Sequence, residues 1–166
     1  MRTSDLALVL IRLTIQEEPH LVLIRHRKWG DWSLVGGHLE PEERSDWARA
    51  ARRECNEELA PLRYGADFTL LPLLDRPVRW GPVPSRSAGN VPTIYTAQFF
   101  ALRFLRPPAE CLAQLPAENF CIVREADVAV SSPAGDLPLP ARALQSVRRP
   151  SLAWDMPLSS APALHA

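Results

Sequence analysis

The chain has 166 residues, enough for one domain with a buried core and too few to expect two. Nineteen basic and nineteen acidic side chains leave no net charge at neutral pH, so overall charge favours neither nucleic acid nor a membrane surface as partner. The three cysteines, Cys55, Cys111 and Cys121, are an odd number without paired spacing, which indicates free thiols in a reducing cytoplasm. No apolar run reaches the roughly 18 to 20 residues of a membrane-spanning helix.

The N-terminal part of the chain predicts three strands. Leu6–Leu13 and Leu21–His26 are apolar runs separated by Gln16-Glu17-Glu18-Pro19, which indicates a hairpin or near-hairpin. Arg12 interrupts the first run, so it is typical of a strand and not of a signal peptide. A short third strand is expected at Trp32–Val35, directly before Gly36-Gly37.

A helix is expected to begin at Ser45 or Asp46, which are good N-caps, and to end before Pro61. At about 100° per residue, three carboxylates share an arc of roughly 100° on this helix. They border a face of small and apolar residues. The carboxylates are Glu54, Glu57 and Glu58, and the apolar positions are Ala48, Ala51, Cys55 and Leu59.

This acidic arc is unfavourable for the helix alone. Like charges three or four residues apart cost roughly 0.2 to 0.5 kcal/mol per pair, and negative charge in the last turn opposes the helix dipole. A hard divalent cation would reverse both effects, since Mg²⁺ is commonly held by carboxylates and substrate phosphates. The alternative is a solvated acidic helix end, neutralised by Arg52 and by Arg53.

Further strands are expected at Phe68–Leu74, Thr93–Phe104 and Phe120–Val123, and a second helix from Pro140 to about Arg149. Strands, helix, strands, helix fit an α/β/α sandwich with a mixed sheet between helices. We expect residues 1–150 to form this single domain. Residues 151–166, rich in Pro, Ala and Ser, are expected to be a tail that is docked or partly mobile, and Trp154 favours docking.

The region from the two glycines through the acidic helix resembles the Nudix box, G-x5-E-x7-R-E-U-x-E-E-x-G-U, where U is a bulky aliphatic residue. Gly37 and Glu43 keep its first spacing, and Arg53-Glu54-Cys55-Asn56-Glu57-Glu58 keeps its second block in order. The motif covers about 25 residues directly, and its length and mixed composition make chance agreement improbable.

The chain departs from the motif in several ways. Nine residues separate Glu43 from Arg53 where the family has seven, and Ala60-Pro61 replaces the closing glycine and aliphatic residue. Cys55 stands where an aliphatic residue is usual. The insertion puts the roles of Glu40 and Glu43 in doubt. We expect it to lengthen the loop between Glu40 and Ser45, because an extra residue inside the helix would rotate the three carboxylates away from the glycines.

The resemblance implies the Nudix fold and a Mg²⁺- or Mn²⁺-dependent hydrolase that cleaves the pyrophosphate bond of a nucleoside diphosphate linked to another group. It implies metal ligands at Glu54, Glu57, Glu58 and the backbone of Gly37, with Glu54 and Glu57 in catalysis and Arg53 orienting a glutamate. An additional glutamate outside the box is expected at Glu118, with Glu125 as the alternative; a surface carboxylate is the competing interpretation. The competing function is a Nudix-like nucleotide-binding or regulatory module with weak or no catalysis.

Substrate identity is expected to depend on residues 76–92, the longest predicted connection, which contains four prolines. Guanidinium groups of Arg76, Arg79 and Arg86 would bind phosphates, and Trp80 would stack on a base. The alternatives are a contact between the copies of a homodimer or a merely rigid proline loop. The expected partner is therefore a small-molecule nucleotide in the cytoplasm, with no nucleic acid and no membrane.

Overall fold

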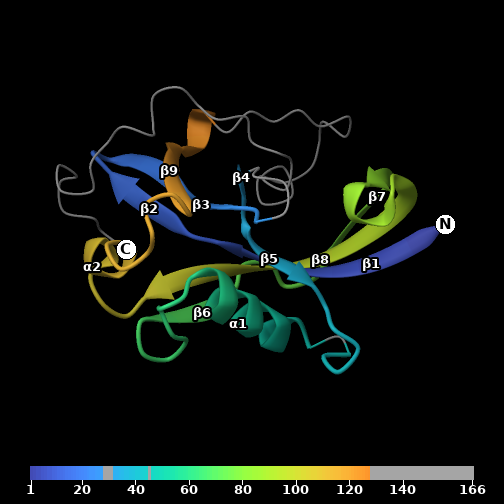
Figure 1. Cartoon of the computed structure of the whole chain (residues 1–166), viewed down its shortest axis with the longest axis horizontal. Helices are drawn as coiled ribbons and strands as arrows, with labels where there is room; N and C mark the ends of the chain where they lie inside the picture. The colour runs from blue at the N-terminus through green and yellow to red at the C-terminus, as the bar shows by residue number, and fades with distance from the viewer. Residues whose placement is uncertain (28–31, 45, 128–166) are drawn as a thin grey trace.

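The computed structural model describes residues 1–27, 32–44 and 46–127, which form two sheets and one principal helix (Figure 1). The predicted helix at Pro140–Arg149 and the tail at 151–166 lie outside the described residues. The elements in chain order are β1 (Arg2–Leu10), β2 (Arg12–Ile15), β3 (Glu18–Arg25), β4 (Trp32–Ser33), β5 (Val35–His38), α1 (Trp47–Glu58), β6 (Phe68–Pro72), β7 (Val78–Ser85), η1 (Arg86–Ala88), β8 (Val91–Phe104), α2 (Pro108–Leu112), β9 (Phe120–Arg124) and η2 (Glu125–Asp127).

The larger sheet is mixed and has the order β5-β1-β8-β6, with β7 also pairing with β8. Its central strands β1 and β8 are parallel, and the other pairs are antiparallel. The smaller sheet is antiparallel, with β2 and β4 on either side of β3 and β9 also paired to β3. This is the predicted α/β class with a mixed sheet, and the strands are divided between two sheets.

Two predicted strands are each split because the chain passes from one sheet to the other. Leu6–Leu13 divides at Ile11, with β1 in the larger sheet and β2 in the smaller. Trp32–Val35 divides at Leu34 in the opposite direction, so β5 returns to the larger sheet. Ile11 and Leu34 are both buried, so apolar character continues through each crossing, and a hydropathy pattern alone cannot reveal the break.

The first hairpin is confirmed between β2 and β3. Ile15 pairs with Glu18, so the loop consists of Gln16 and Glu17, and both have positive φ (51° and 65°). Two consecutive residues with positive φ are the requirement of a type I′ turn, whose twist matches that of the flanking strands.

Helix α1 packs on the larger sheet, on the face opposite the smaller sheet (Figure 1). Its N-cap is Asp46, whose Oδ1 accepts a hydrogen bond from the Arg49 amide at 3.0 Å. Ala50, Ala51 and Cys55 are buried against the sheet, whereas Ala48 is exposed, so its predicted place on the apolar face was wrong. The helix continues without interruption to Glu58, and residues 41–44 form a turn. The insertion is therefore accommodated before the helix, as predicted.

The segment 76–92 is not the irregular loop that the prolines suggested. It contains β7, which pairs antiparallel with β8 through a register shift between Trp80 and Val83, and the short helix η1. β7 is an edge strand, and edge strands tolerate proline because one side of the backbone needs no ladder partner. The sequence pattern therefore mistook an edge strand for a connection.

Candidate active site

The glycine pair lies in strand β5, where it allows α1 to approach the sheet closely. Gly36 has φ of +138°, and a Cβ there would overlap the Ala7 carbonyl oxygen. A Cβ at Gly37 would overlap the carboxylate of Glu54. The Gly36 amide donates a hydrogen bond to Glu58 Oε2 at 3.0 Å. Only glycine can provide this backbone geometry together with the space for the two carboxylates.

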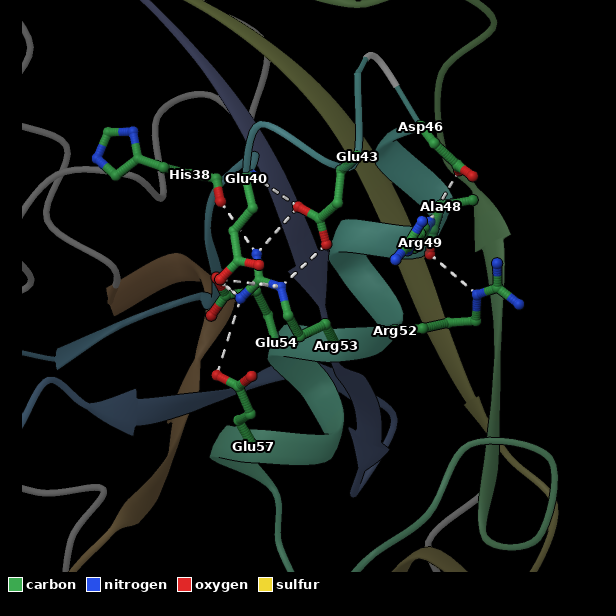
Figure 2. A network of polar contacts seen from close by, with 10 residues as sticks. All are labelled: His38, Glu40, Glu43, Asp46, Ala48, Arg49, Arg52, Arg53, Glu54 and Glu57. Atoms are coloured by element: carbon green, nitrogen blue, oxygen red, sulfur yellow. Dashed lines mark hydrogen bonds and ion pairs between the residues drawn. The ribbon is translucent and has the colours of Figure 1, made fainter.

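Arg53 is the centre of a polar network that joins α1 to the preceding turn (Figure 2). Its Nε and Nη2 donate to Glu43 at 2.9 and 3.1 Å, and its Nη1 donates to Glu54 at 2.8 Å. Nη2 also donates to the His38 carbonyl oxygen at 3.1 Å. Glu57 lies farther away, with 3.8 Å from Arg53 Nη1 to Glu57 Oε2, and its side chain is 60% exposed. Arg53 thus positions one glutamate and leaves another open to solvent.

Glu43 is the functional residue whose place the sequence left in doubt. Its side chain is only 3% exposed, and its Oε2 also accepts the Glu40 amide at 2.8 Å. The signal was present in the first spacing of the motif, from Gly37 to Glu43, but the insertion that follows made the position uncertain. Because the turn at 41–44 absorbs the extra residues, Glu43 still reaches Arg53.

The electrostatics of the carboxylates differ according to their surroundings. Hydrogen bonds from Arg53 hold the pKa of Glu43 below its ordinary range. Burial raises the pKa of Glu54 despite its bond to Arg53, and burial raises that of Glu58 to about 7, with the neighbouring Glu54 charge adding to the effect. Two partly buried carboxylates therefore lie side by side with incomplete compensation, which is typical of functional sites.

A divalent cation suits this donor set. Among the described residues, no three His, Cys, Asp or Glu side chains already stand in the arrangement of a metal cluster. The donor chemistry nevertheless fits Mg²⁺ or Mn²⁺, because Glu54, Glu57 and Glu58 offer only carboxylate oxygens. The raised pKa of the buried Glu58 indicates that its negative charge lacks a full counter-charge, which a bound cation would supply.

The other predicted site residues do not join this network in the described part of the chain. Glu118 is exposed in the turn before β9, next to Asn119, whose carbonyl accepts the amide of Arg25. Glu125, the alternative, is held by Arg12 at 2.6 Å near the opposite end of β9.

The predicted substrate-binding residues are distributed along 76–88. Arg76 is exposed before β7, and Arg86 begins η1. Arg79 is exposed, and Trp80 is half-buried against the second apolar cluster between the sheets. Since neighbouring residues in a strand point to opposite faces, Arg79 and Trp80 lie on different faces of the larger sheet.

The fold and this geometry define a mixed α/β domain in which a glutamate-bearing helix is held against a glycine strand. A family model described as the NUDIX domain matches residues 5–129. The chain belongs to the Nudix family, whose members are mostly pyrophosphohydrolases that use divalent metals.

Solved structures support the same fold. The Ap4A hydrolase of C. elegans superposes with a TM-score of 0.52 and 20% identity, over 75% of this chain and 83% of that chain. Shewanella oneidensis NrtR gives 0.49 and 16% identity, over 85% of this chain and 58% of that one. A mutT/nudix family protein from Listeria innocua gives 0.47 and 20% identity, over 76% and 81%. The comparison with curated protein sequences finds no match. No helix in the described ranges is both long and apolar enough to cross a membrane.

Proposed function

We propose that this chain is a Mg²⁺- or Mn²⁺-dependent hydrolase that cleaves the pyrophosphate bond of a nucleoside diphosphate linked to another group. The observation that carries the proposal is the convergence of Glu54 and Glu58 on Gly36-Gly37. That arrangement brings two carboxylates into partial burial, where both pKa values rise. It is unfavourable for an isolated helix and suitable for oxygen coordination.

Each residue of the network has a role in this proposal. Glu54, Glu57 and Glu58 would hold the metal with the backbone of Gly37, and Glu54 or Glu57 would accept a proton from the attacking water. A bound divalent cation would neutralise phosphoryl oxygens and lower the pKa of that water. Arg53 is a positioning residue, because its N–H groups are directed to Glu43, Glu54 and the His38 carbonyl. The exposure of Glu57 leaves it free to reach a ligand.

The substrate contacts form the second part of the proposal. We keep Trp80 as a contact to the base and Arg76, Arg79 and Arg86 as candidates for phosphates. Glu118 is kept as the candidate additional carboxylate. Because Arg79 and Trp80 lie on different faces of the sheet, they would contact different parts of the substrate.

The competing proposal is a binding or regulatory module of the same family. The missing closing glycine at Ala60 and the inserted turn favour it, whereas the complete set Glu54, Glu57 and Glu58 favours the enzyme. A nucleotide affinity without hydrolysis in the presence of Mg²⁺ and Mn²⁺ would support the module.

The test is a panel of nucleotide sugars, dinucleotides including Ap4A, ADP-ribose and nucleoside triphosphates, assayed with Mg²⁺ or Mn²⁺ for released nucleotide or phosphate. For an accepted substrate, Glu57→Gln should lower kcat by at least about 100-fold, since the ligand oxygen remains while its charge is lost. The matched control is Glu42→Gln, which alters an exposed carboxylate in the turn before α1. Equal activity of Glu57→Gln and the control would show that the site is misassigned.

A further inference from the structure

A row of three side chains lies on the face of the larger sheet opposite α1. Trp80 pairs with Tyr95 between β7 and β8, and Tyr95 pairs with Ser4 between β8 and β1. Directly paired residues point to the same face of a sheet. Trp80 packs against the apolar cluster between the two sheets, and so does Leu6, two residues from Ser4. The row therefore lies on the inner face, at the end where β1, β8 and β7 project from the body (Figure 1).

The first two members of this row form an aromatic surface. The Trp80 and Tyr95 rings are stacked, with centroids 5.4 Å apart and an interplanar angle of 21°. Both residues are half-buried, so part of the pair remains accessible. On the other side of Tyr95 the neighbouring residue is Ser4, whose side chain is too small to cover a phenol ring. Stacking therefore continues from Trp80 to Tyr95 and stops there.

A second ring lies on the far side of Ser4. His38 Nδ1 is 2.7 Å from Ser4 Oγ, and its strand β5 is the neighbour of β1. Strands β8 and β5 are two strand spacings apart, about 10 Å, with Ser4 between them. Tyr95 and His38 thus flank a position occupied only by a hydroxymethyl group. One flat ring has the dimensions to stack on Tyr95 there, within hydrogen-bond reach of polar atoms on the other side.

This position is directly connected to the proposed catalytic site. The His38 side chain contacts Ser4, while its backbone carbonyl accepts a hydrogen bond from Arg53. Gly36, which donates to Glu58, is two residues away in the same strand, about 7 Å. A ligand with a flat ring above Ser4 could therefore extend its phosphates toward the carboxylates.

We infer that Tyr95 and Trp80, together with Ser4 and His38, bind the nucleobase of the substrate. The inference rests on the proposed function and adds to it the residues that recognise the base. Stacking would supply affinity for any base and more for a purine, whose two rings cover more of the aromatic surface. The Ser4 hydroxyl and the His38 imidazole would provide the polar contacts.

The test measures equilibrium binding of AMP and of adenosine by titration calorimetry, in EDTA, so that neither metal nor hydrolysis is required. Tyr95→Leu should weaken both ligands about tenfold, within the range measured for loss of a base-stacking side chain. Tyr95→Phe should bind within about twofold of the unaltered protein, because the ring is retained. The matched control is Tyr64→Leu. Tyr64, the other tyrosine, contacts Phe68 and Arg52 and lies outside this row.

Each result decides the inference separately from the proposed hydrolysis. It is overturned if the unaltered protein does not bind AMP at millimolar concentration, or if Tyr95→Leu and Tyr64→Leu weaken binding equally. Weakened AMP binding with unchanged adenosine binding also overturns it, because the contact would then not be to the base. Loss of adenosine binding in Tyr95→Leu alone supports the base site even if no substrate is hydrolysed. Hydrolysis with unchanged binding in Tyr95→Leu would leave the proposed function intact and remove this inference.

Discussion

At the scale of single residues, the two adjacent glycines have different physical roles. Gly36 is required by its backbone conformation and by contact with the backbone of Ala7, whereas Gly37 is required by contact with the end of the Glu54 side chain. A backbone contact cannot be relieved by changing a rotamer, but a side-chain contact can. Substitution at the two positions should therefore affect stability and activity differently.

We predict that Gly36→Ala lowers the free energy of unfolding by about 3 kcal/mol or more, since it combines a strained φ with a backbone overlap. Gly37→Ala should cost less stability but reduce kcat, because Glu54 must move away from β5. Gly65→Ala is the control, since Gly65 has φ of +82° and no atom within 4 Å of an added Cβ. Urea denaturation and kinetics measure both effects. A stability loss for Gly37→Ala equal to that for Gly36→Ala would contradict this explanation.

Glu58 should make stability depend on pH. Burial raises its pKa from the ordinary 4.5 to about 7, so between these values the folded state binds a proton that the unfolded state has lost. The free energy of unfolding should then fall as pH rises through this window, by up to roughly 3 kcal/mol. In EDTA, denaturation of the unaltered protein between about pH 5 and 8 should show this slope. Glu58→Gln, which stays neutral, should reduce it; an unchanged slope would assign the effect to another group.

At the scale of elements, the turn at 41–44 and helix α1 act as one unit because Arg53 bonds to both. The turn includes Arg44, with φ of +40°, and presents Glu43 to the guanidinium of Arg53. The helix contributes Glu54 to the same guanidinium. The insertion lengthened the connection without separating these groups, since the entropy of loop closure rises only slowly with length.

Glu43→Gln should lower the free energy of unfolding by about 2 kcal/mol, because a buried carboxylate that accepts from Arg53 and from the Glu40 amide loses its charge. Activity should fall as well, since Arg53 would be held less firmly beside Glu54. The neighbouring Glu42→Gln, in the same turn but exposed, should change neither. Chemical denaturation and substrate kinetics on both variants provide the measurement. If Glu43→Gln were as stable as Glu42→Gln, the turn and the helix would not be coupled through Arg53.

At the scale of the whole molecule, the site lies where α1 meets β5 at the edge of the larger sheet. Cys55, in the same helix, is fully buried in the apolar cluster below it, and burial places the pKa of its thiol well above the ordinary range. The charged groups are therefore concentrated on one side of α1 and the core on the other. Binding of a cation by those charged groups would stabilise the folded chain as a whole.

Mg²⁺ or Mn²⁺ should consequently raise the thermal midpoint. At about 100 times Kd the stabilisation is about 2.7 kcal/mol, equivalent to several degrees for a domain of this size. Glu57→Gln should reduce the shift, whereas Glu42→Gln should retain it. Thermal denaturation with increasing metal, at constant ionic strength, is the measurement. Equal shifts in both variants would indicate that the metal binds elsewhere.

The sequence by itself determined the α/β class, the limits of the acidic helix, the first hairpin and the convergence of the helix carboxylates on the glycines. These features depend on local periodicity, capping and turn chemistry, or on a motif whose spacing persists in the chain. Asp46, Gln16 and Glu17 are examples whose structural roles follow from their immediate neighbours.

Only the tertiary structure decided the division into two sheets, the pairing of β7 and the place of Glu43. The crossings at Ile11 and Leu34 are as apolar as the strands around them, and β7 contains prolines that an edge strand tolerates. Glu43 is fixed by Arg53, ten residues away across an inserted turn, and Tyr95 meets Trp80 and Ser4 through strand register. Such contacts depend on which strands become neighbours, and that is decided by packing of the whole domain rather than by any local pattern.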